Sequence, residues 1–218
     1  MKKLLHIPHS SLIVPDRFYE GLLISKEDFA RYNLEMSDIG VCELFSHIEG
    51  ERIIAPCSRL YCDLERFKDD SKEPMAKYGE GVIYTHTYDG KLFHRHDKVY
   101  VDEVMKYYDN YHQKFDEMAL KLLNEEGELL ILDCHSFSDK MASHFFKPPF
   151  PDICIGIEKD YFDEKILDKI LLEIKNKGYS YKINYPYSGS IIPNVLMHNK
   201  VDGKVVTIMI EVNKRIYL

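Results

Sequence analysis

The 218-residue sequence lacks the features that mark several classes of protein. No run of residues approaches the roughly 20 apolar positions that a helix needs to cross a bilayer. The first residues, Met1 to Pro8, carry two lysines before an apolar stretch that is too short for a signal peptide. Basic residues are in deficit, with 29 Lys and Arg against 36 Asp and Glu, a net charge of −7. We therefore expect neither a membrane nor a nucleic acid as partner.

Cysteines are few, and their spacing forms no metal or redox motif. The five cysteines stand at positions 42, 57, 62, 134 and 154, and none belongs to a C-x-x-C pair. This spacing argues against a thiolate zinc knuckle and against a thioredoxin-like site. An odd number of cysteines without a disulfide pattern fits reduced thiols, so we expect a cytoplasmic protein.

The chain shows no internal repeat and no linker. Apolar residues make up 45% and charged residues 30%, a balance that excludes a disordered or low-complexity protein. A chain of this length suits one large domain better than two. We therefore expect a single catalytic domain over residues 1–218.

Short apolar runs alternate with segments of helical periodicity. Strands are expected at residues 3–7, 52–55, 129–133, 153–157, 179–184 and 205–212. Helices are expected at residues 25–33, 37–48, 97–126 and 163–177. The near-continuous apolar run 129–133 is typical of a sheet covered on both faces. The alternation predicts an α/β domain with a mixed, mostly parallel sheet flanked by helices.

Three of the expected strands end in reactive side chains. His9 follows the first strand, His135 follows the central one, and Glu211 closes the last. The carboxyl ends of parallel strands form the ligand crevice of an open α/β sheet, so these side chains are expected to converge. Two imidazoles and a carboxylate, with one position left for water, make a catalytic zinc site, and a further carboxylate would move the proton. The alternative is a set of histidines that only form hydrogen bonds near the surface.

Two further segments are candidates for substrate contact. Arg59 and Arg66 stand seven residues apart, and this spacing suits an anion clamp in which Asp63 orients one guanidinium group. The alternative is a solvated, salt-bridged loop. The segment 184–190 contains a proline and a glycine, and it forms either a turn with Asn184 at a binding pocket or a plain connection.

Taken in order, these segments resemble the N-formylglutamate amidohydrolase family. No single segment is specific, but together they cover nearly the whole chain. The matching segments are Pro8-His9-Ser10-Ser11, Ser37-Asp38, Ser58-Arg59 to Arg66, Tyr111-His112, Asp133-Cys134-His135-Ser136, Asp152 to Gly156, Asn184 to Gly189 and Glu211 to Arg215.

The resemblance implies a fold similar to zinc carboxypeptidases and aspartoacylases. It also implies a zinc-dependent reaction that splits N-formyl-L-glutamate, a small acidic N-acyl amino acid, into formate and glutamate. In that family's pattern, His9 and His135 match metal ligands and Glu211 matches the general base. Arg59 and Arg66 match the clamp for the substrate carboxylates.

Two positions depart from the patterns of related enzymes. The carboxypeptidase-type His-x-x-Glu pair is absent because position 12 is leucine, so we assign the third metal ligand to Asp38, at the expected start of a helix. The family's usual asparagine before the second clamp arginine is Glu65 here, and its carboxylate could repel an acidic substrate or neutralise Arg66.

Two other functions are compatible with the same residues. One is a zinc peptidase or deacylase with another substrate, such as a cell-wall peptide, which would tolerate an acid at position 65. The other is a non-catalytic homologue that keeps the fold and binds an acidic small molecule.

Overall fold

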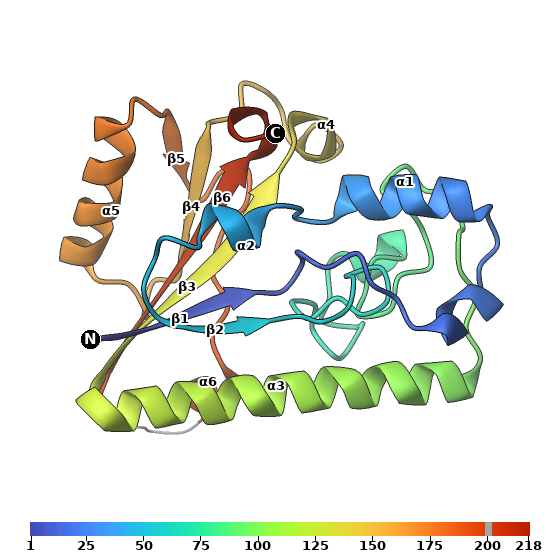
Figure 1. The fold of residues 1–218 in the computed structure, drawn as a ribbon, viewed down its shortest axis with the longest axis horizontal. Helices are drawn as coiled ribbons and strands as arrows, with labels where there is room; N and C mark the ends of the chain where they lie inside the picture. Colours follow the sequence, from blue (N-terminus) through green and yellow to red (C-terminus); the bar gives the residue numbers. More distant parts are fainter. Residues whose placement is uncertain (199–201) are drawn as a thin grey trace. The chain divides into compact units, whose positions relative to one another are not determined.

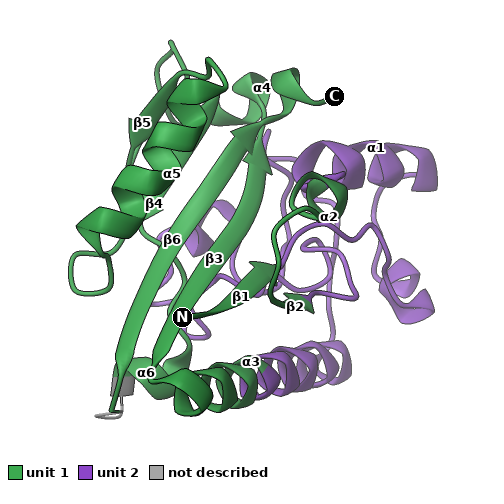
Figure 2. Cartoon of the chain, turned by 60° about the vertical axis from the view of Figure 1, so that its left-hand side comes forward, with its two compact units in different colours: residues 1–7, 41–53, 115–218 green, residues 8–40, 54–114 purple. Residues whose placement is uncertain are grey.

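The computed structural model describes residues 1–198 and 202–218 (Figure 1). Its contacts fall into two compact units (Figure 2). Unit 1 consists of Met1–Ile7, Val41–Ile53 and Phe115–Leu218, and unit 2 of Pro8–Gly40 and Ile54–Lys114. This division does not test the expectation of one catalytic domain over residues 1–218, which stays a prediction.

Unit 1 is built on a six-stranded sheet in the order β2-β1-β3-β6-β4-β5. The strands are β1 (Lys2–Ile7), β2 (Glu51–Ile54), β3 (Glu128–Phe137), β4 (Ile153–Ile157), β5 (Tyr181–Ile183) and β6 (Lys204–Asn213). β1, β3 and β6 run parallel, β4 runs antiparallel to β6, and β5 is parallel to β4. The predicted α/β class with a mixed, mostly parallel sheet is confirmed.

The two faces of this sheet carry different side chains, because successive residues of a strand point to opposite sides. Apolar residues such as Leu5, Leu132 and Ile208 pack on one face against α2 (Val41–Leu44) and α5 (Glu164–Asn176). The other face carries polar residues toward the carboxyl ends of β1, β3 and β6, and α3 (Lys98–Glu126) contributes the buried ring of Phe115 there. Both faces of the central strand are therefore buried, as its apolar run predicts.

Two of the predicted helices have the expected limits. A backbone N–H of α3 donates to Asp97 Oδ1 at 2.7 Å, and the helix ends before Gly127, whose φ of 71° ends a helix without strain. Its residues 98–114 belong to unit 2 and its residues 115–126 to unit 1. α5 is capped by Asp163, which accepts from a backbone N–H at 3.0 Å. Two short helices of unit 1, α4 (Asp139–Ala142) and α6 (Asn194–His198), were not predicted.

Unit 2 has one regular helix besides its part of α3. α1 (Lys26–Met36) is capped by Ser25, as predicted, and runs three residues beyond its expected end. Two 3₁₀ helices, at Asp16–Glu20 and Ala76–Tyr78, lie among loops. The helix predicted over residues 37–48 is wrong in extent, since only α2 forms there. Gly40 has a φ of 79°, which no right-handed helix contains, so Asp38 lies in a loop and not at a helix start.

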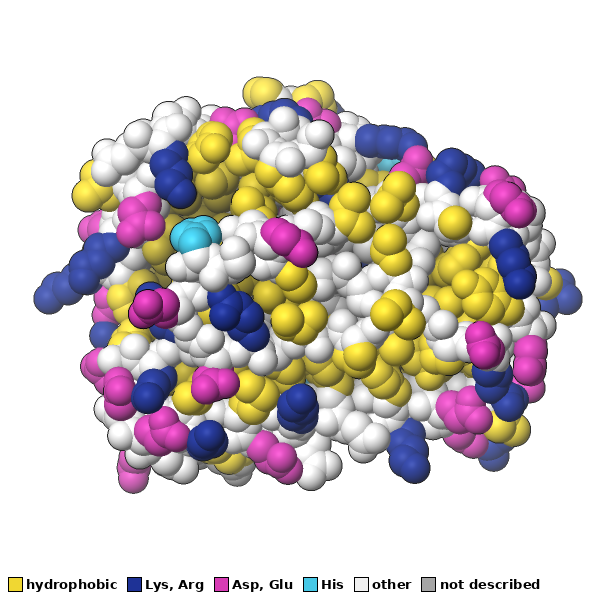
Figure 3. Space-filling model, viewed as in Figure 1, with side chains coloured by type: hydrophobic (Ala, Val, Ile, Leu, Met, Phe, Trp, Pro, Cys, Tyr) yellow, Lys and Arg dark blue, Asp and Glu magenta, His cyan; other side chains and the backbone are white. Residues whose placement is uncertain are grey.

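The surface charge is mixed, as the lack of an excess of basic residues predicts. On the face drawn in Figure 3, basic and acidic side chains are interspersed. Within residues 1–198 and 202–218, none of the helices combines the length and the apolar character needed to cross a bilayer.

Candidate active site

A buried carboxylate, Asp63, organises the polar residues of unit 2. Its Oδ1 accepts from His9 Nε2 at 2.9 Å, and its Oδ2 accepts from Arg59 Nη2 and from the Tyr84 hydroxyl, each at 2.7 Å. Burial alone would raise the pKa of Asp63, but the charges of Arg59 and Arg66 and the hydrogen bond from His9 outweigh it and hold that pKa well below its usual range. Asp63 is therefore an ionised acceptor, and His9 must be the donor of their hydrogen bond.

His9 is held as a neutral imidazole. Burial, and then the charge of Arg59, lower its pKa against the opposing pull of Asp63. With Nε2 donating to Asp63, the lone pair of the neutral ring is on Nδ1, the form that binds a metal. Nδ1 lies 3.8 Å from Asp38 Oδ2 and 3.7 Å from Glu65 Oε2. Two metal–ligand bonds of about 2.1 Å allow donor atoms up to about 4.2 Å apart, so either carboxylate can share an ion with His9.

Backbone contacts bring both carboxylates to His9. Asp38 is buried, and its N–H donates to the carbonyl oxygen of His9 at 2.8 Å. The N–H of Glu65 donates to Asp63 Oδ1 at 3.1 Å. The structure therefore brings the predicted ligands His9 and Asp38 together within unit 2, through a loop contact and not through a helix.

The two predicted clamp arginines meet at one phenol oxygen. Nη2 of Arg59 lies 3.3 Å and Nη2 of Arg66 3.2 Å from the hydroxyl of Tyr84. The Nε atoms also form hydrogen bonds within the protein. Arg59 Nε donates to Asp63 at 3.2 Å, and Arg66 Nε donates to the carbonyl of Glu80 at 3.1 Å. The predicted orientation of an arginine by Asp63 is confirmed.

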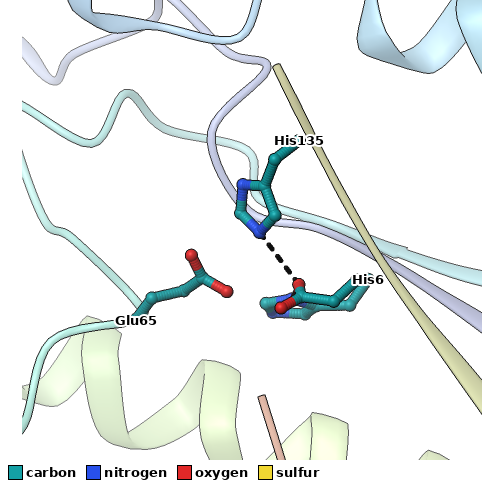
Figure 4. A group of neighbouring side chains, drawn as sticks. His6, Glu65 and His135 are labelled. Carbon is teal, nitrogen blue, oxygen red and sulfur yellow. Dashed lines mark hydrogen bonds and ion pairs between the residues drawn. The ribbon is translucent and has the colours of Figure 1, made fainter. Parts of the chain in front are cut away.

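A second buried carboxylate, Asp133 of β3, plays the same part in unit 1. Its Oδ1 accepts from His6 Nδ1 at 2.8 Å and from His135 Nε2 at 2.9 Å, the contact dashed in Figure 4. Its Oδ2 accepts from the N–H of Ile191 at 3.1 Å. Burial would raise the pKa of Asp133, but His135 and His6 outweigh it and hold the pKa well below its usual range. His135 therefore donates from Nε2 in this hydrogen bond, and Nδ1 is its other ring nitrogen.

His135 and Glu211 are register partners on β3 and β6, so their side chains leave the same face of the sheet. The expectation that His135 follows the end of its strand is wrong, because β3 continues to Phe137, paired with β6 along its whole length. Glu211 is also paired with Cys154 of β4, and burial raises the pKa of that thiol to about 11. Glu211 thus has a neutral thiol on one side and an imidazole on the other.

The remaining predicted residue, Asn184, lies in an exposed loop at a φ of 53°. Its Oδ1 accepts from the N–H groups of Ile157 and Gly189, at 2.9 and 3.4 Å. These bonds give Asn184 a part in shaping the loop, and its contact with substrate stays a prediction. Arg215, from the last matching segment, joins Asp139 and Asp152 at 2.8 Å each and holds the end of β6 in place.

Two residues of these networks were not predicted. Tyr84 gave no signal, since one tyrosine among sixteen has no distinguishing neighbour in the sequence. His6 did give one, because it is a polar residue inside the buried apolar run 3–7.

The whole sequence matches a known protein family. The model of the N-formylglutamate amidohydrolase family matches residues 1–218. The chain belongs to this family. Family membership identifies it as an amidohydrolase, a hydrolase of amide bonds.

Two solved structures are similar in fold. The N-formylglutamate amidohydrolase from Ralstonia eutropha JMP134 superimposes with a TM-score of 0.81 at 19% identity, over 99% of this chain and 83% of that one. The gene product Atu2144 from Agrobacterium tumefaciens gives a TM-score of 0.71 at 18% identity, over 98% and 81% of the two chains. No curated protein matches the sequence.

Proposed function

We propose that this amidohydrolase cleaves the acyl amide of an N-acylated acidic amino acid, with N-formyl-L-glutamate as the leading substrate and zinc as the cofactor. Two carboxylate–histidine pairs, His9–Asp63 and His135–Asp133, carry the proposal. In each pair a buried carboxylate accepts a hydrogen bond from Nε2, which leaves Nδ1 as the ring nitrogen for a metal. Metal-binding histidines almost always donate their other ring N–H to a carboxylate or carbonyl in this way, so the donor set fits zinc.

The zinc ligands in this proposal are His9, Asp38 and His135. Two imidazoles and one carboxylate, with a fourth position open, are the donor set of a catalytic zinc. Zinc there would supply Lewis acidity, polarising the acyl carbonyl and lowering the pKa of water to about 7.

Glu211 is the proposed general base. It accepts a proton from the attacking water, whose oxygen forms the new bond to the acyl carbon. The C–N bond then breaks, and Glu211 returns the proton to the departing amine. Formate and the free amino acid are the products from an N-formyl substrate.

Arg59 and Arg66 are proposed to bind the carboxylates of the substrate through their Nη1 atoms. Both guanidinium groups are held against Asp63 and Tyr84 before a ligand arrives, which lowers the entropy lost on binding. The proposed location is a reducing cytoplasm, which the five free thiols support.

A substrate panel tests the proposal. Purified protein supplied with zinc is assayed for amine release from N-formyl-L-glutamate, N-acetyl-L-glutamate, N-formyl-L-leucine and a short acidic peptide. We expect the highest kcat/KM with N-formyl-L-glutamate. Turnover of the peptide alone would identify a peptidase, whose substrate would tolerate the acid at position 65. Binding without turnover of any substrate would identify a non-catalytic homologue.

A further inference from the structure

His6, near the end of β1, is a buried histidine to which the proposed reaction gives no role. Its side chain is 0% exposed, and its ring stacks on Phe115 of α3 with the centroids 4.7 Å apart and the planes at 15°. An apolar ring would fill this space without the cost of burying two polar nitrogens. The hydrogen bond of His6 is therefore the feature that distinguishes it from a packing residue.

That hydrogen bond ends on Asp133. His6 and Asp133 are register partners on the parallel strands β1 and β3, so the backbone pairing brings both side chains to the same face. His6 Nδ1 donates to Asp133 Oδ1 at 2.8 Å, and His135 Nε2 donates to the same oxygen at 2.9 Å. In Figure 4 the ring of His135 points toward His6, and the dashed line marks its hydrogen bond to Asp133. With Ile191 N–H on Oδ2, the carboxylate is held by three donors.

We propose that His6 is a positioning residue that acts on His135 through Asp133. Its N–H holds Oδ1 in the one orientation in which that oxygen also accepts from His135 Nε2. His135 is thereby kept in the Nε2–H tautomer, with the lone pair on Nδ1. This inference rests on the proposed function, in which His135 is a zinc ligand, and it adds a residue that lies outside the matching segments.

The substitution His6→Phe tests this role. It keeps an aromatic ring against Phe115 and removes the donor to Asp133. His94→Phe is a matched control in unit 2, because His94 is also buried, stacks on Phe18 at 4.5 Å and 27°, and has its Nε2 2.9 Å from the carbonyl of Phe18. Both variants lose hydrogen bonding of a buried ring, but only His6→Phe changes the partners of Asp133.

The first readout is the ¹⁵N NMR spectrum of the imidazoles in the metal-free protein. We expect His135 as a single Nε2–H tautomer in the wild type and in His94→Phe, and as a mixture of tautomers in His6→Phe. The second is zinc affinity by competition with a chelator, which should fall on the order of 10–100-fold in His6→Phe and stay unchanged in His94→Phe. A single tautomer together with wild-type zinc affinity in His6→Phe would overturn the inference.

The wild-type spectrum decides the question if His6→Phe does not fold. His6 must then appear as the Nδ1–H tautomer and His135 as the Nε2–H tautomer, and the reverse for either ring overturns the inference. A wild-type protein that shows these tautomers and binds no zinc would contradict the proposed cofactor while upholding the positioning of His135 by His6.

Discussion

His135 and Glu211 stand opposite each other on neighbouring parallel strands, at paired positions of β3 and β6. Their side chains therefore share one face of the sheet, next to His6 and Asp133 and opposite the apolar face that packs on α2 and α5. Residues 76 positions apart in the sequence are neighbours because the two strands pair along their length. This pairing sets a proposed metal ligand beside the proposed base.

Glu211→Gln should lower kcat by on the order of 10²–10⁴, because the amide keeps the shape of the side chain and cannot accept the proton of water. Zinc content should stay at the wild-type level. Steady-state kinetics and metal analysis of the same sample check both statements. Glu128→Gln, at the exposed start of β3, is the control and should leave both unchanged. A Glu211→Gln enzyme of normal rate would assign the base elsewhere.

Asp38→Asn and Glu65→Gln separate the two carboxylates that lie beside His9 Nδ1. We expect Asp38→Asn to lose zinc on dialysis and Glu65→Gln to retain it, because Asp38 is buried and its backbone is bonded to that of His9. Mass spectrometry of the native protein measures the bound metal. The opposite pattern would make Glu65 the third ligand.

Arg66→Lys should raise the KM for N-formyl-L-glutamate and the KM for N-formyl-L-leucine by different factors. The factor should be larger for N-formyl-L-glutamate, by about tenfold or more. A lysine keeps the charge and loses the planar fork that binds a carboxylate. The two substrates share the formyl amide and the α-carboxylate, so their comparison isolates the side-chain carboxylate. Equal effects on both substrates would show that Arg66 has no part in recognising that group.

His94 should make the free energy of unfolding depend on pH. Burial lowers its pKa in the folded state, so as pH falls below about 6.5 the unfolded chain takes up a proton that the folded chain does not. This uptake destabilises the folded state at low pH. His94→Phe should cost about 1 kcal/mol at pH 7.5 through its lost hydrogen bond, and the deficit should shrink by pH 5.0. Chemical denaturation at both pH values measures it, and a deficit that grows on acidification would refute this assignment.

The sequence predicts the strands, the long helix α3 and the reactive residues near the strand ends, because apolar periodicity and helix caps are local signals. Register is not local. Nothing in the sequence states that β1 lies beside β3, so the contact of His6 with Asp133 could not be foreseen. The prediction that Asp38 starts a helix was also wrong. The apolar residues after position 37 have helical spacing, and this pattern gives no sign of the turn at Gly40. Tyr84 joins the arginines only through loop geometry.

Zinc content per chain, measured in the wild type, His9→Ala and His135→Ala after purification in zinc-containing buffer, tests the central claim most directly. We expect close to one zinc in the wild type and a large loss in each variant, because one ion needs both imidazoles. Equal zinc in all three proteins would contradict it.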